Sequence, residues 1–162
     1  MSEEQVFELS VEQVEDFEFR VRFNGTAIPD LATDEPPPQG HDAGPNPARL
    51  LLAATANCLA ASLLFALRKF RNTPGSIKAD ARARMARNTN GRWRIAGMEV
   101  EVQLADAAAS LKNLDRALAQ FEDFCIVTES VRAGIPVAVR VRDGDGNEMH
   151  AVNAARTPAT HA

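Results

Sequence analysis

The chain is poor in cysteine and histidine, and both shortages narrow its chemistry. Its 162 residues include only two cysteines, Cys58 and Cys125, and three histidines. The histidines, His41, His150 and His161, show no metal-ligand spacing. A metal site shared between them and the cysteines is therefore a weak alternative. With so few cysteines and no secretory signal, we expect a reducing cytoplasm, where a cysteine pair is catalytic or inert rather than a structural disulfide.

Other signatures are also missing. The acidic start Met-Ser-Glu-Glu-Gln lacks the basic residues and apolar run of a signal peptide. No Ser-His-Asp arrangement, phosphate loop, dinucleotide fingerprint or internal repeat is present. A net charge of −4 disfavours nucleic acid and anionic membrane as partners. The longest apolar run, residues 50–67, is interrupted by Thr55, Asn57 and Ser62, so it predicts a buried helix rather than a membrane span.

Residue patterns predict several strands. Apolar residues alternate with polar ones over residues 7–11 and 17–23, which predicts a pair of strands with one buried face. Residues 28–47 then form an irregular, proline-rich segment. The later predicted strands, with a hairpin turn at residues 88–91, cover residues 77–85, 93–95, 98–104 and 136–142.

One long helix is predicted between these groups of strands. Asn46 is suited to cap it and Pro47 to occupy its first position, while Lys69 and Arg71 suit its C-terminal end. Pro74-Gly75 then ends the helix.

An amphipathic second helix is predicted from Asp106 or Ser110 to Cys125, and a short one from Thr128 to Ala133. The apolar face of the second helix consists of Leu111, Leu114, Leu118, Phe121 and Phe124.

This order of elements indicates an α+β fold with an antiparallel sheet packed against helices. The length and composition suit one domain over residues 1–142, followed by a turn and a C-terminal tail over residues 143–162. The long helix is apolar on nearly all sides and needs cover on more than one face. We therefore expect a homodimer.

The two cysteines lie within the predicted helices. Cys58 is about three turns from the start of the long helix, too far for the helix N-terminus to activate its thiol. Activation would need a nearby cation. If the fold brings Cys58 and Cys125 together, the chain has the parts of a thiol-based redox enzyme. If it does not, both are small core residues, which is the usual environment of free cysteine.

Four features of the chain occur together: Gly44-Pro45-Asn46-Pro47, the apolar helix with Cys58, the strands that follow, and Cys125 before a final strand. In these features the chain resembles the OsmC/Ohr family of osmotically induced and organic hydroperoxide resistance proteins. The resemblance implies sheets wrapped around long central helices in an intertwined homodimer. It also implies a peroxidase that reduces organic hydroperoxides with a dithiol reductant and uses neither metal nor flavin. Carried over, Cys58 is the peroxidatic cysteine and Cys125 the resolving one.

Some positions depart from the family pattern. Ala48 stands where a Glu that holds a catalytic Arg is common, and Ile126 stands where Pro often follows the second cysteine. The activating Arg usually comes from the N-terminal strands, so Arg20 and Arg22 are the candidates, with Arg49 a further possibility. The carboxylates that could replace the Glu are Asp34, Glu35, Glu122 and Glu129.

Two functions are therefore carried forward. The first is a thiol peroxidase that favours bulky organic hydroperoxides, because Leu51, Leu59, Phe121 and Phe124 offer apolar surroundings. The second is a non-catalytic dimer of the same fold that binds a small apolar ligand or has a structural role. The absence of the Glu at position 48 is the main support for this alternative.

Overall fold

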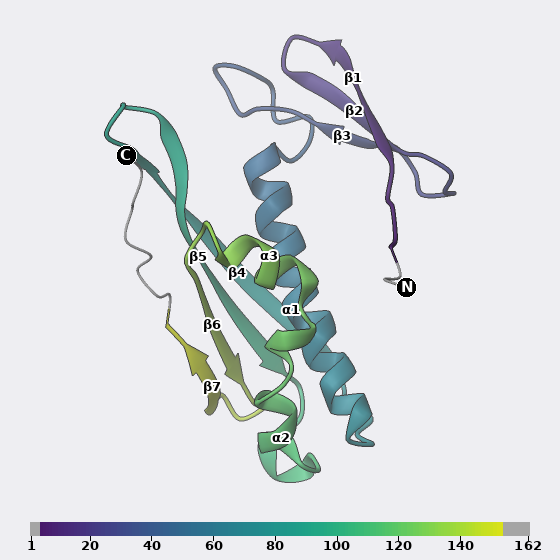
Figure 1. Ribbon diagram of the computed structural model, residues 1–162, viewed down its shortest axis with the longest axis vertical. Helices are drawn as coiled ribbons and strands as arrows, with labels where there is room; N and C mark the ends of the chain where they lie inside the picture. Colours follow the sequence, from purple (N-terminus) through teal and green to yellow (C-terminus); the bar gives the residue numbers. More distant parts are fainter. Residues whose placement is uncertain (1–3, 154–162) are drawn as a thin grey trace. The chain divides into compact units, whose positions relative to one another are not determined.

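A computed structural model of the chain describes residues 4–153. The chain divides into two compact units between Leu50 and Leu51, coloured purple to blue and blue to yellow along the sequence in Figure 1. Each unit has its own sheet. The mixture of sheets and helices confirms the predicted α+β class.

The first unit contains a small antiparallel sheet in the order β1-β2-β3. Its strands are β1 (Leu9–Glu15), β2 (Glu18–Phe23) and β3 (Leu31–Thr33). The predicted strand pair is confirmed, although β1 begins and ends later than expected. The predicted buried face is wrong for β1, because all seven of its residues are exposed. The short β3 was not predicted, because it lies in the segment interpreted as irregular and has only three residues.

Helix α1 (Pro47–Lys69) begins in the first unit and continues into the second. The side-chain oxygen of Asn46 accepts the backbone N–H of Arg49 at 3.0 Å, so the predicted cap is confirmed. By length and composition α1 could cross a membrane, since an 18-residue window has a mean hydropathy of 2.1. The core helix of a soluble protein passes the same test, and Leu59, Leu63 and Leu67 of α1 are completely buried.

The second unit is built on a four-stranded sheet in the order β4-β5-β6-β7. Its strands are β4 (Ile77–Arg87), β5 (Trp93–Leu104), β6 (Val137–Arg142) and β7 (Glu148–Val152). Strand β5 runs through Gly97, where a break was predicted, and the register with β4 shifts there, because Ala96 of β5 is an extra residue opposite the step from Arg84 to Met85. The β5–β6 pair is parallel, whereas the other pairs are antiparallel.

Strand β7 lies in the segment that was predicted to be a turn and tail. The turn at residues 143–147 is present, and β7 follows it and pairs with β6. The frayed tail was predicted from residue 153 onward, and residues 154–162 lie outside the described part of the chain. The domain boundary at residue 142 stays a prediction.

The predicted continuous helix ending at Cys125 is wrong. The chain instead forms η1 (Ala108–Ser110), α2 (Leu114–Leu118) and η2 (Glu122–Phe124), and then α3 (Ile126–Arg132). Two features break the helix. Asn113 has a left-handed backbone with a φ of 50°, and the side chain of Asn72 holds the backbone of Lys112 through two hydrogen bonds.

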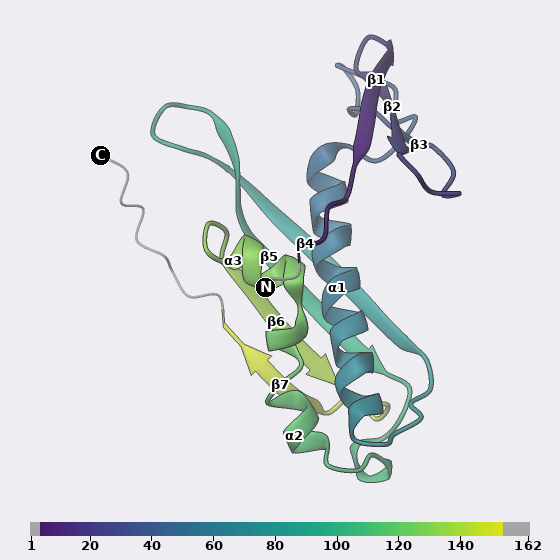
Figure 2. The same ribbon diagram turned by 45° about the vertical axis from the view of Figure 1, so that its right-hand side comes forward.

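The core of the second unit lies between one face of the sheet and the helices. Figure 2 shows α1, α2 and α3 on the same face of the four strands. Inward side chains alternate along β5 and β6, and they pack against α1 and α2. These buried strand residues are Met98, Val100, Val102, Leu104, Val137, Val139 and Val141.

Candidate functional site

The second unit brings Cys58 and Cys125 together. Cys58 lies on α1, is partly buried and packs against the hydrophobic core that contains Cys125. Cys125 is completely buried, and both thiols are free. The Cys58 thiol lies close enough to Cys125 to contribute to a raised pKa of Cys125. The structure thus places one partly accessible thiol beside one enclosed thiol.

Cys125 is held at the start of a helix. Its backbone is extended, and its sulfur caps α3 by accepting the N–H of Thr128 at 3.4 Å. The Cys125 sulfur and the Thr128 hydroxyl also form a hydrogen bond of 2.9 Å. The prediction that Cys125 ends a helix is therefore corrected, since it begins one.

Burial makes the Cys125 thiolate costly. Removal from water is the largest cause that raises the pKa of Cys125, and the neighbouring Cys58 thiol raises it further. Hydrogen bonds from Thr128 lower the pKa but do not offset these effects. At neutral pH Cys125 is therefore held mainly as a thiol.

Apolar side chains surround the part of the core that contains the two sulfurs. Leu59 and Phe121 are completely buried, while Leu51 and Phe124 are partly buried. The ring of Phe124 meets that of Phe65 edge-on, with centroids 5.0 Å apart. The four residues that were predicted to form an apolar surround thus belong to the core of the unit that carries the cysteines or pack against it.

The first unit pairs both candidate arginines with a carboxylate that sequence reasoning missed. Arg22 donates to Asp30 at 3.2 Å, and this contact raises the pKa of Arg22. The guanidinium of Arg20 lies 4.0 Å from the same carboxylate. The β2–β3 register pairs Arg20 with Ala32 and Val21 with Leu31, which brings Asp30 next to Arg22. Only the unpredicted β3 could have indicated this contact.

The two carboxylates proposed from the proline-rich loop have other partners. Asp34 is buried and accepts the backbone N–H groups of Glu35, His41 and Ala43, and these bonds, led by that from His41, lower its pKa. Gly40 packs so closely on Asp34 that a Cβ there would clash with its carboxylate. Glu35 accepts the side chain of Asn46 at 3.0 Å. Both therefore organise the loop that leads into α1.

The remaining proposed residues also have partners. Arg49 pairs with Asp42 at 2.8 Å. Glu122 and Glu129 do bind an arginine, but it is Arg132 of α3 rather than Arg20 or Arg22.

His150 is a candidate functional residue that the sequence did not indicate, because it lies near the predicted C-terminal tail. It lies in β7, and its Nε2 is 2.5 Å from a carboxylate oxygen of Glu122. Among the residues that the structure describes, no group of three His, Cys, Asp or Glu side chains could hold a metal ion.

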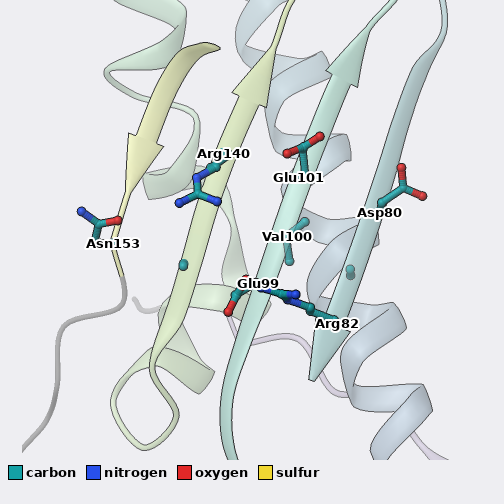
Figure 3. Close-up of a pocket in the computed structure, with 9 residues that line it drawn as sticks. Asp80, Arg82, Glu99, Val100, Glu101, Arg140 and Asn153 are labelled. Carbon is teal, nitrogen blue, oxygen red and sulfur yellow. Dashed lines mark hydrogen bonds and ion pairs between the residues drawn. The ribbon is translucent and has the colours of Figure 1, made fainter. Parts of the chain in front are cut away.

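A cavity of about 790 Å³ lies along strands β4, β5 and β6 in the second unit, and Figure 3 shows its charged lining. The lining contains neither cysteine. Arg82 in this cavity donates two hydrogen bonds to Glu99, of 2.8 and 2.6 Å. The cavity therefore lies apart from the two thiols.

Comparison with known proteins decides the family. The family model described as OsmC-like protein matches residues 40–140, which is more than half of the chain. The chain belongs to the OsmC-like protein family. No curated protein sequence matches this chain significantly.

Solved structures share the fold of this OsmC-like protein at low sequence identity. An OsmC-like protein of unknown function from Vibrio cholerae has a TM-score of 0.71 and 17% identity, over 87% of this chain and 99% of that one. An organic hydroperoxide resistance protein from Elizabethkingia anophelis has a TM-score of 0.68 and 16% identity, over 88% and 99%. The organic hydroperoxide resistance protein OhrB of Bacillus subtilis has a TM-score of 0.63 and 14% identity, over 85% and 98%.

Proposed function

We propose that this OsmC-like protein is a thiol peroxidase that reduces organic hydroperoxides in a reducing cytoplasm. The observation that carries the proposal is the packing of the partly buried Cys58 against the core that encloses Cys125, close enough to influence the pKa of Cys125. Peroxide can approach the more accessible sulfur of Cys58, while the sulfur of Cys125 is enclosed in the core nearby. The names of the Elizabethkingia and Bacillus proteins support hydroperoxides as the substrate class.

The proposed reaction has two steps that use the cysteines in turn. The Cys58 thiolate attacks the distal peroxide oxygen, the O–O bond breaks, and the alkoxide takes a proton and leaves as an alcohol. Cys58 is then a sulfenic acid. The Cys125 thiolate attacks the Cys58 sulfur, hydroxide takes a proton and leaves as water, and a disulfide forms. An external dithiol reduces this disulfide by thiol exchange.

We assign the positive charge near the reacting peroxide to Arg20 or Arg22. A thiolate needs a compensating cation. The support is the Asp30 carboxylate, which both guanidinium groups approach. In this proposal Asp30 orients Arg20 or Arg22. It takes the place of the Glu that is common in the family at the position of Ala48.

The substrates are proposed to be bulky and apolar. The core around the thiols contains Leu59, Phe121 and Phe124. Hydrocarbon next to the peroxide group can bury surface there, at about 25 cal/mol per Å², whereas hydrogen peroxide has none to bury.

We also propose a homodimer. Several large apolar side chains in the first unit are exposed, among them Phe7, which is 92% exposed. The charges of the chain are also separated. Residues 4–18, the acidic segment, hold six Asp or Glu and no Lys or Arg, whereas residues 82–94, the arginine hairpin, hold five Arg and no acid. A second copy of this chain offers both the apolar and the opposite charged surface.

Turnover by cysteine variants tests the peroxidase proposal. Wild-type protein with dithiothreitol should consume cumene hydroperoxide faster than hydrogen peroxide, and Cys58→Ser should abolish the reaction. Cys125→Ser should form a sulfenic acid at Cys58 once but no intramolecular disulfide. Equal, negligible consumption by the wild type and by Cys58→Ser would favour the non-catalytic dimer. Loss of the first oxidation in Cys125→Ser would show that the two roles are reversed.

A further inference from the structure

Three charged or polar side chains from three different elements meet near Cys125, which lies between η2 and α3. Glu122 lies in η2, Arg132 in α3 and His150 in β7. One carboxylate oxygen of Glu122 accepts a hydrogen bond from the Nε2 of His150 at 2.5 Å, and the other accepts one from the guanidinium of Arg132. We call these three residues the Glu122 cluster.

The Glu122 cluster is largely shielded from water. The Glu122 side chain is 12% exposed and that of His150 is 19% exposed. The His150 ring also packs edge-on against the buried ring of Phe121, with centroids 5.1 Å apart. Charge-assisted hydrogen bonds in such surroundings are stronger and more rigid than exposed ion pairs.

The cluster is joined directly to the enclosed cysteine. The backbone carbonyl of Glu122 accepts the N–H of Cys125 at 2.9 Å, and the carbonyl of Cys125 accepts the N–H of Glu129 at 3.0 Å. The Glu122 side chain thus ties the turn before Cys125 to α3 on one side and to β7 on the other. Besides this side chain, η2 is held by its own short turn and by the packing of Phe124 against Phe65.

We propose that Glu122, held by hydrogen bonds from His150 and Arg132, is a positioning residue. It keeps Cys125 at a place from which it can form a disulfide with Cys58. This inference rests on the proposed function for its biological meaning, because disulfide closure is the second step of that reaction. Glu122 contributes to closure through the backbone of Cys125. The first step, at Cys58, does not depend on it.

A peroxide-independent reaction isolates the closing step. In dithiobis-nitrobenzoate, a disulfide reagent, the Cys58 thiolate attacks one sulfur and releases the first coloured thiolate. The Cys125 thiolate then attacks the Cys58 sulfur of the mixed disulfide and releases the second. Both protein thiols lose a proton and are oxidised, and the reagent is reduced to two thiolates. The rate of the second release measures how well Cys125 is placed.

Three variants distinguish a loss of Cys125 positioning from a general loss of structure. Glu122→Gln removes the charge with little change in size, and His150→Phe removes the N–H donor but keeps a ring against Phe121. Glu129→Gln is the matched control, because Glu129 binds the same Arg132 at 2.8 Å but is 48% exposed. We expect the second release to slow by about tenfold in the first two variants and to stay near wild type in Glu129→Gln. The first release should be unchanged in all three.

Three results would overturn the inference. One is an unchanged second release in Glu122→Gln or His150→Phe. Another is equal slowing of both releases, which would indicate a general loss of structure. The third is a wild type that never releases the second thiolate. If the wild type closes the disulfide but does not consume cumene hydroperoxide, the proposed function fails while the role of Glu122 stands.

Discussion

The residue that governs the second step of the proposed reaction is Cys125, and its environment favours the neutral thiol. Burial, the Cys58 thiol and the two contacts with Thr128 act on the same sulfur, and the net effect is a raised pKa. Its position at the head of α3 gives it one backbone donor, the N–H of Thr128. The sulfur is therefore well placed but weakly ionised.

This ionisation predicts a steep pH dependence for disulfide closure. Because the folded pKa of Cys125 is raised, the thiolate fraction is small at neutral pH and grows about tenfold per pH unit until that pKa is reached. The rate of the second thiolate release should therefore keep rising beyond pH of about 8.5, the ordinary thiol value. A plateau below that pH would contradict the proposed environment.

Thr128→Val tests the part played by the hydroxyl. The variant keeps the shape of the side chain but loses the 2.9 Å contact with Cys125. One hydrogen bond of about 0.5–1.5 kcal/mol corresponds to a rate about two- to tenfold slower at a given pH. Ser130→Ala is a suitable control, since Ser130 lies on the same helix and its hydroxyl donates to the Ile126 carbonyl at 2.8 Å. Equal rates in the two variants would show that the Thr128 hydroxyl has no part in closure.

At the scale of elements, Asn72 determines the path of the chain after β5. It is buried, and its amide donates to the carbonyls of Leu67 and Lys112 and accepts the N–H of Lys112 at 2.7 Å. These bonds fasten the end of α1 to the turn between η1 and α2. They also explain why the chain does not continue as one helix through residue 113.

Asn72→Ala should therefore weaken the fold rather than the chemistry. The loss of three hydrogen bonds, two of which hold the backbone of Lys112, is expected to lower the free energy of unfolding by about 2–3 kcal/mol. Urea unfolding measures this change. The exposed neighbour Thr73→Ala should change it by less than about 0.5 kcal/mol. A loss in Asn72→Ala as small as in Thr73→Ala would mean that the bonds to Lys112 are not needed.

The parts of the fold that the sequence predicted correctly are those with local causes. Helix α1 has its cap, its first proline and its basic C-terminal end within its own residues. The β4–β5 hairpin has its turn residues between two alternating strands. The break after η1 could not be predicted in this way, because Asn72 and Lys112 are 40 residues apart.

The same distinction applies to the candidate site. The cysteines stood out because each lies in a strongly patterned segment, but their proximity follows from tertiary packing. Asp30 became visible only with the register of β3, and His150 only with the pairing of β7. Which arginine activates Cys58 stays a prediction.

At the scale of the whole molecule, the acidic segment and the arginine hairpin predict salt-sensitive association. If opposite charges on two copies meet, raising the salt from about 0.05 M to 0.5 M screens them and should weaken the dimer by about tenfold. Sedimentation measures the association constant. Arg92→Gln in the hairpin should weaken association at low salt, whereas Lys112→Gln, outside both segments, should not. An association constant that does not respond to salt would leave only the apolar contacts as its cause.

Parallel pairing of β5 with β6 has a consequence for how the protein is made. Two parallel neighbours cannot be joined by a tight turn, so residues 105–136 must travel back along the unit before β6 can add to the sheet. Cys125 lies inside that return path. A ribosome-bound chain that has not yet released β6 therefore lacks the completed sheet, and we expect Cys58 and Cys125 to reach their native arrangement only after β6 has left the ribosome.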